Sequence, residues 1–269
     1  MTPMKNGTQV ARGHDVPVEA DSVDSPILHY GDPVTAVHFL TEDGRWSRVT
    51  FERLDSLRVS RGEHHPFPLH PDDEDEFHWV TTVSNSEWLR ERYEYERRNY
   101  ESSYNFGGAV EEMLEEFSHY VFSFHDEFVE AIAAGIWFEV EESLLVDRPI
   151  GHGHPLKGLT HLEPVEEFES SGIRCSVRRN PMGSADLDGA AALCSQTVLE
   201  VGAELDGGYS PSWFLTRRVR NGVGLSYLRN YFGNKVDTYS GIPSLQELRP
   251  HIDRWLAEVR DRRRQMGKS

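Results

Sequence analysis

The last third of the chain carries the feature that most constrains the fold. Between residues 197 and 205 an apolar or small side chain recurs at every second position, and two of the four residues between them are glutamates. This period of two predicts a β-strand with one buried face. Farther along, Asn221-Gly222 separates the strand-like segments 212–220 and 223–232. Both central residues of a type I′ turn need positive φ, so this dipeptide is a strong hairpin signal. We therefore predict an antiparallel meander in this region.

The two-residue turn also fixes a register for the predicted hairpin. It pairs Arg220 with Val223, Arg218 with Leu225, Thr216 with Tyr227 and Phe214 with Arg229. One face then carries a basic and aromatic set: Arg218, Arg220, Tyr227, Arg229 and Tyr231. The other face carries Trp213, Leu215, Val219 and Leu228, and we expect this second face to lie against the core.

Further strands are predicted upstream. The segments 34–40 and 46–51 flank Glu42-Asp43-Gly44, which is a second hairpin signal. Shorter strands are expected at 54–60, 79–83 and 173–178. Residues 119–140 contain many aromatic and β-branched side chains, which favours two or three strands with bends near Asp126 and Gly135. Apolar residues every four positions from Phe128 onward leave a helix open as the alternative.

Helices are predicted in three places. Ser84 and Glu87 match a capping box and begin a helix with an apolar stripe that includes Leu89 and Tyr93. A second helix is expected over 110–117, and a helical turn or two over 185–194. The C-terminal helix begins at a second capping box, Ser244 with Glu247; its stripe comprises Leu245, Leu248, Ile252, Trp255, Leu256 and Val259.

Together these elements predict an α+β fold. A mainly antiparallel sheet, built from hairpins and the C-terminal meander, is expected to pack with three or more helices, the last of them long. Residues 1–25 are polar and aperiodic, which predicts a loose tail. Residues 26–269 are expected to form a single domain, or two packed halves that meet near the Pro-, Gly- and His-rich loop 143–168.

The charge is strongly acidic and unevenly distributed. The 269 residues include 45 acidic and 28 basic side chains, and the formal net charge of −17 argues against non-specific nucleic-acid binding. Only four of the bases are lysines, which fits either a salt-adapted host or a GC-rich genome. Residues 99–147 contain twelve acids and no Lys or Arg, whereas residues 207–236 contain five bases and no acid. This segregation suits electrostatically steered association.

Several function classes lack their sequence signals. The chain contains no GxGxxG, GxSxG or HExxH pattern. No apolar run is long enough to span a membrane, and no apolar segment near residue 1 resembles a secretory signal. Cys175 and Cys194 do not form a CxxC pair. We therefore expect a cytoplasmic protein that does not bind membranes.

One group of side chains could bind a metal. His119, His125 and Asp126 lie close together in the sequence, and His152 and His154 form an HxH pair in the long loop. Imidazole and carboxylate groups are suitable ligands for zinc, manganese or iron. A metal-dependent hydrolase could use His125, Asp126 and Glu130 catalytically, with a divalent metal as its cofactor. The alternative is that these are ordinary surface and turn residues in a chain with 13 histidines.

The hypothesis we favour is binding to a macromolecular partner. The basic, aromatic hairpin face (Arg218, Arg220, Tyr227, Arg229 and Tyr231) could contact an acidic partner, which we expect to be a protein. Its alternatives are stacking of nucleic-acid bases, or a sheet face that is solvated or paired with the acidic middle segment of the same chain. Immunity proteins and antitoxins provide an analogy of class only. Whether the chain is an enzyme stays open, no catalytic residue is assigned under this hypothesis, and the metal-dependent hydrolase remains the alternative.

Overall fold

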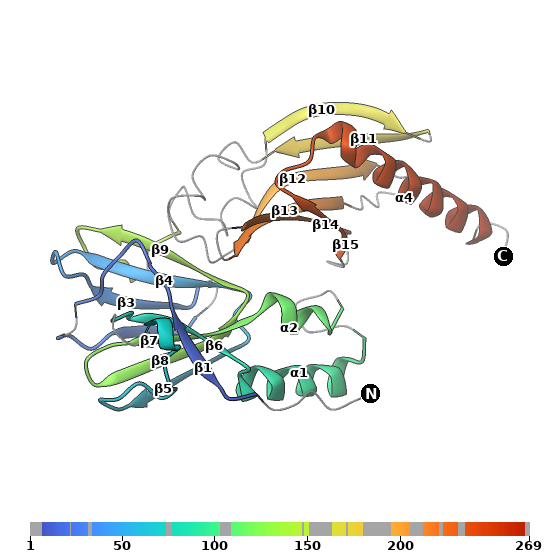
Figure 1. The fold of residues 1–269 in the computed structure, drawn as a ribbon. Coiled ribbons are helices and arrows are strands. Elements are labelled where there is room, and N and C mark those ends of the chain that lie inside the picture. The colour runs from blue at the N-terminus through green and yellow to red at the C-terminus, as the bar shows by residue number, and fades with distance from the viewer. Residues whose placement is uncertain are drawn as a thin grey trace. The chain divides into compact units, whose positions relative to one another are not determined.

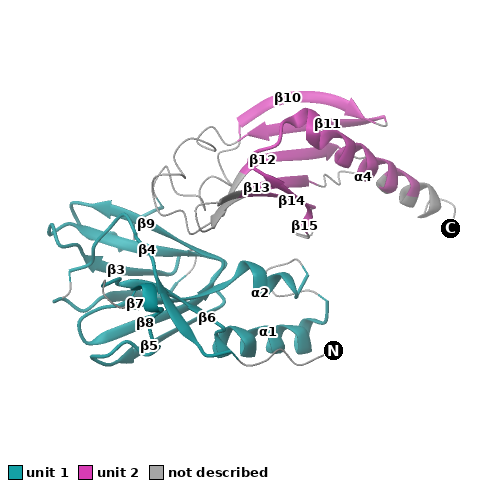
Figure 2. Cartoon of the chain, in the orientation of Figure 1, with its two compact units in different colours: residues 1–154, 187–194 teal, residues 155–186, 195–269 magenta. Residues whose placement is uncertain are grey.

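The computed structural model describes residues 7–21, 23–31, 34–73, 77–102, 109–146, 148–150, 163–170, 172–179, 195–204, 212–220, 223–230 and 235–266. The chain divides into two compact units (Figure 2). Unit 1 comprises residues 1–154 and 187–194, and unit 2 comprises residues 155–186 and 195–269. No described helix is long and apolar enough to cross a membrane.

Unit 1 contains two antiparallel sheets (Figure 1). The five-stranded sheet has the order β1-β6-β7-β8-β5, and the four-stranded sheet has the order β2-β3-β4-β9. The strands of the first sheet are β1 (Val10–Gly13), β5 (Ser56–Arg61), β6 (Val80–Ser84), β7 (Ser118–Ser123) and β8 (Glu127–Ala133). Those of the second are β2 (Ile27–His29), β3 (Ala36–Leu40), β4 (Trp46–Glu52) and β9 (Gly135–Glu141).

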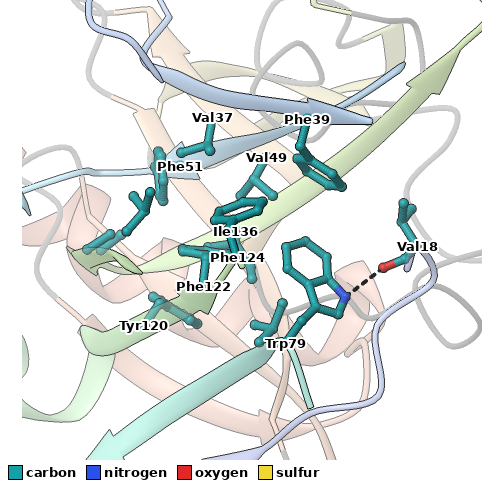
Figure 3. Packing of buried hydrophobic residues seen from close by; sticks show 14 residues of the cluster. Val18, Val37, Phe39, Val49, Phe51, Trp79, Tyr120, Phe122, Phe124 and Ile136 are labelled. Atoms are coloured by element: carbon teal, nitrogen blue, oxygen red, sulfur yellow. Dashed lines mark hydrogen bonds between the residues drawn. The ribbon is translucent and has the colours of Figure 1, made fainter. Parts of the chain in front are cut away.

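The two sheets pack face to face around an aromatic core (Figure 3). Trp79 lies near its centre, with its ring centroid 4.9 Å from that of Phe39 and 5.9 Å from that of Phe124. Its indole N–H donates a 2.9 Å hydrogen bond to the carbonyl oxygen of Val18. The indole thus buries a large apolar surface and also satisfies its single donor, as a buried tryptophan requires.

Two helices cover the opposite face of the five-stranded sheet. They are α1 (Glu87–Tyr100) and α2 (Glu112–Glu116), and a short 3-10 turn, η1 (Pro71–Asp73), precedes β6. Tyr93 of α1 and Met113 of α2 pack against Ile132 of β8 in a separate core cluster. Because side chains alternate along a strand, β7 and β8 are buried on both faces. The outer face of this sheet holds the polar network described below.

Unit 2 is a six-stranded antiparallel meander, β10 to β15 in sequence order, with helix α4 (Leu245–Met266) packed on one face. Its strands are β10 (Glu163–Ser170), β11 (Ile173–Arg179), β12 (Ser195–Glu204), β13 (Ser212–Arg220), β14 (Val223–Arg229) and β15 (Lys235–Ser240). The predicted capping box at the start of α4 is confirmed. Ser244 N–H donates to Glu247 Oε2 at 2.7 Å, and Glu247 N–H donates to Ser244 Oγ at 3.3 Å.

The predicted α+β class is wrong, because the described chain is mostly antiparallel sheet. Fifteen strands in three sheets carry both cores, and only three α-helices accompany them in the described ranges. The second helix has just five residues. The N-terminus of α1 also differs from the prediction, since Ser86 rather than Ser84 is its N-cap. The helical turn predicted over 185–194 lies outside the described residues.

Two regions predicted to lack structure contain strands. Val10–Gly13 of the expected tail is β1, which pairs with β6 in the five-stranded sheet. Val18 is buried in the aromatic core, so the tail prediction is wrong for this segment. The expected loop 143–168 contains most of β10, an exposed edge strand with glutamate at half of its eight positions. Neither strand has the apolar alternation that sequence patterns detect.

Candidate functional site

The β13–β14 hairpin has the predicted register. Arg220 pairs with Val223, Arg218 with Leu225 and Phe214 with Arg229. The predicted core face is also confirmed where side chains are described: Trp213, Leu215 and Leu228 are buried beside α4. The opposite side of the hairpin, which we call the hairpin outer face, carries positions 214, 216, 218, 220, 225, 227 and 229.

Cationic groups surround a tyrosine on the hairpin outer face. The guanidinium carbon of Arg229 lies 5.7 Å from the centroid of the Tyr227 ring, and the Nζ atom of Lys235 lies 5.3 Å from the same centroid. All three side chains are half-buried. An aromatic ring next to two cations offers both apolar contact area and donors for carboxylates, and tyrosine and arginine are enriched at protein interfaces.

The other predicted residues of this face are placed only in part. Arg218 and Arg220 occupy β13 at positions of the outer face, but their side chains lie outside the described part of the structure, as does all of Tyr231. Two more arginines share the face on β11. Arg174 lies 4.0 Å from Glu204, and Arg178 lies 3.9 Å from Glu200.

The segregation of charge follows the division into units. Unit 1 has 32 acidic and 12 basic side chains, a formal charge of −20. Unit 2 has 13 acidic and 16 basic side chains, a formal charge of +3. The strongly negative net charge of the chain therefore comes from unit 1, and unit 2 can present a positive surface despite it. Fields of opposite sign on one chain orient an approaching charged partner.

A buried polar network occupies the outer face of the five-stranded sheet in unit 1. The Leu89 N–H donates to Ser86 Oγ at 3.0 Å, which caps α1. The Ser86 hydroxyl donates to Nδ1 of His119 at 2.8 Å, and Nε2–H of His119 donates to Glu130 at 2.8 Å. Arg58 completes the network with two bonds to the Glu130 carboxylate, at 2.6 and 2.8 Å. Because the Glu130 carboxylate can only accept, His119 Nε2 must carry the hydrogen, and Nδ1 then accepts from the Ser86 hydroxyl. His119 is therefore assigned the Nε2–H tautomer.

The environment of this network fixes its protonation states. Burial lowers the pKa of His119 and outweighs the opposing effect of Glu130, so the ring is neutral near pH 7. Burial acts to raise the pKa of Glu130, but the bonds from His119 and Arg58 hold it below its ordinary value. Glu130 is therefore a buried carboxylate whose charge is compensated by Arg58.

Aromatic rings enclose the network. The Phe67 and Trp88 rings stand edge-on to the imidazole of His119, with centroids 5.2 and 5.1 Å away. The guanidinium of Arg58 lies 4.3 Å from the Trp88 ring centroid. With both ring nitrogens of His119 engaged and the serine hydroxyl serving as a helix cap, these groups stabilise the contact between α1 and the sheet. The sequence pattern predicted a cap for this helix but placed it at Ser84, whereas the N-cap is Ser86.

The predicted metal ligands do not come together in the described structure. His125 Nδ1 lies 2.8 Å from Asp126 Oδ1 at the exposed turn between β7 and β8, whereas His119 and Glu130 are buried within those strands. His152 and His154 lie outside the described residues. Among the residues that are described, no group of three or more His, Cys, Asp or Glu side chains could hold a metal ion. The geometry thus gives no support to the hydrolase alternative.

Comparison of the chain with protein-family models, with curated proteins and with solved structures finds no match.

Proposed function

We propose that this chain is a cytoplasmic binding protein whose partner is another protein with an acidic surface. The hairpin outer face of unit 2 is the proposed contact, with Tyr227, Arg229 and Lys235 at its centre. The observation that carries the proposal is a cation-flanked tyrosine in a segment without any acid, on a chain with a net charge of −17. Any resemblance to immunity proteins or antitoxins remains one of class.

The chemistry of the face favours a protein partner over nucleic acid. A phosphate backbone would be attracted to the hairpin but repelled by unit 1, with its formal charge of −20. A protein can present a few carboxylates to the arginines without carrying a dense negative charge of its own. Tyrosine and arginine are also the residue types that most often dominate the affinity of protein interfaces.

Affinity capture with matched variants tests this proposal. The full-length chain, its Arg229→Glu variant and its Arg174→Glu variant are immobilised and exposed to a native lysate of the source cells. Arg174 is the control because it lies on the same face of the sheet, on β11, and its side chain is 74% exposed. We expect a protein that is retained in stoichiometric amount by the wild type and by Arg174→Glu but lost from Arg229→Glu.

Three outcomes would contradict the proposal. One is the repeated absence of any stoichiometric protein in the wild-type capture. Another is a partner that both variants retain equally, which would place the contact elsewhere. The third is retention of nucleic acid in place of protein, recognised by nuclease sensitivity and a steep dependence on salt.

A further inference from the structure

Unit 1 has a sheet edge of unusual composition at β2. This strand closes one side of the four-stranded sheet, and within the described part of the chain its one partner is β3, with Leu28 opposite Val37. Four large apolar side chains in and around it are exposed to solvent: Val23 (76%), Ile27 (42%), Leu28 (38%) and Tyr30 (80%). An edge strand presents backbone N–H and C=O groups that another strand can pair with.

The exposed side chains lie on both faces of this edge. Leu28 is on the side of Val37, which points into the aromatic core, so it continues the core layer to the rim of the sheet. Ile27 lies opposite His38, on the other side. A strand added beside β2 would therefore gain apolar neighbours above and below its own backbone.

The charge around the edge selects what could be added. Residues 13–44 contain seven acidic side chains and no Lys or Arg. Asp21 lies beside the end of β3, where its N–H donates to the carbonyl oxygen of Leu40 at 2.8 Å. Natural edges are often protected by lysines. Here the neighbouring charges are carboxylates, which attract a basic segment and repel an acidic one.

We propose that the β2 edge is a second docking surface, which takes up an extended segment of a partner protein with alternating apolar and basic side chains. The added strand pairs with the β2 backbone, its apolar side chains lie on the side of Leu28, and its cations lie on the side of Ile27, where the surrounding carboxylates attract them. This surface belongs to unit 1, whereas the hairpin outer face belongs to unit 2, and the charges of the two surfaces are opposite. A second copy of the same edge does not suit it, because pairing would bring together two edges with the same negative charge, each with seven acids and no Lys or Arg in residues 13–44.

A defined peptide probe tests this inference. The probe is a fluorescently labelled octapeptide of alternating lysine and valine, and its binding to the full-length chain is measured by anisotropy. Two further peptides serve as controls, one with prolines in place of two valines and one with glutamates in place of the lysines. Proline keeps the charge but removes backbone N–H groups, so it separates strand pairing from simple attraction.

Variants locate the bound probe. Ile27→Lys adds a like charge at the edge and should weaken binding about fivefold, a loss of the size expected for one repulsive rim charge. Val236→Lys is the matched control, since Val236 is a comparably exposed valine (44%) on β15, an edge strand of unit 2. Asp24→Asn is a milder second variant, expected to weaken binding about twofold. Neither Val236→Lys nor Arg229→Glu should change the affinity.

The expected result is binding of the lysine–valine peptide alone, with slower amide hydrogen exchange confined to residues 23–31. If the proline peptide bound as tightly as the lysine–valine peptide, charge attraction without strand pairing would explain the binding, and the inference would be overturned. The same conclusion follows if Ile27→Lys and Asp24→Asn both leave the affinity unchanged, or if the wild type does not bind the peptide at millimolar concentration. A wild-type dimer that Ile27→Lys dissociates would show that a second copy occupies the edge, which also overturns it.

Discussion

Replacing Glu130 by glutamine tests the buried network of unit 1. The carboxylate accepts three hydrogen bonds, two from Arg58 and one from His119. In Glu130→Gln the amide oxygen can still accept from one donor, but the amide nitrogen must face another N–H group. The side chain also loses the negative charge that compensates Arg58.

The size of the effect follows from burial. A hydrogen bond to a charged group contributes about 1.5–3 kcal/mol net, and breaking a fully buried pair costs about 3–5 kcal/mol. The Arg58 side chain is 45% exposed, so water replaces much of what it loses. We therefore expect Glu130→Gln to lower the free energy of unfolding by about 2 kcal/mol.

Urea unfolding of the full-length chain, followed by tryptophan fluorescence, measures this loss. The signal follows global unfolding, and Trp88, whose ring centroid lies 4.3 Å from the Arg58 guanidinium carbon, is one of the six tryptophans that contribute to it. Glu127→Gln is the matched control, at the start of the same strand and opposite Arg61 in the register, and it should change stability by less than about 0.5 kcal/mol. A Glu130→Gln loss no larger than that of the control would refute the reasoning. So would strict additivity with Arg58→Gln, since two groups in direct contact should couple.

Three further predictions follow from the two cores and the titrating groups. Trp79→Phe should lower the free energy of unfolding by about 2–3 kcal/mol, because it removes buried ring volume and leaves the Val18 carbonyl without its indole donor. Limited proteolysis should then cut residues 14–20 faster than in the wild type. An unchanged cleavage rate would contradict the role of this contact. Burial lowers the pKa of His119 below the ordinary histidine value of about 6.5, so the unfolded chain binds the proton more readily and stability should fall as the pH drops below about 6.5. In a pH titration of stability, His119→Gln should flatten this slope but not abolish it, since the pKa values of His14 and His65 are lowered as well. Burial raises the pKa of Cys175 to about 11, so in a Cys194→Ser background iodoacetamide at pH 8 should label the native protein far more slowly than the urea-unfolded one.

Local signals accounted for the parts of the fold that the sequence predicted correctly. The Asn221-Gly222 signal predicted a register that holds over seven residues on each side, because pairing in a hairpin is fixed by the length of its turn. The 119–140 segment forms β7, β8 and β9, with bends where Asp126 and Gly135 suggested them. The spacing of four between Phe128 and Ile132 hinted at a helix, but four is also an even number, so both residues lie on the same face of β8.

Partners distant in sequence explain the parts that were missed. β1 forms its ladder with β6, some seventy residues later, and nothing in its four residues announces that pairing. The metal hypothesis grouped His119 with His125 because they are near in sequence. The β7–β8 turn instead carries His125 to the exposed tip and leaves His119 inside, where Ser86 and Glu130 occupy its nitrogens. Sequence proximity could not show those contacts, nor the role of Arg58, which lies 72 residues before Glu130.

The affinity of the captured partner for the wild type and for Arg229→Glu tests the proposed function most directly. Titration calorimetry at physiological ionic strength would compare both with Arg174→Glu. Arg229→Glu reverses a charge beside Tyr227 and should weaken binding at least tenfold, a change of about 1.4 kcal/mol or more. The dissociation constant of the Arg174→Glu control should stay within about twofold of the wild-type value. Equal dissociation constants for the wild type and Arg229→Glu would contradict the assignment of the hairpin outer face as the binding surface.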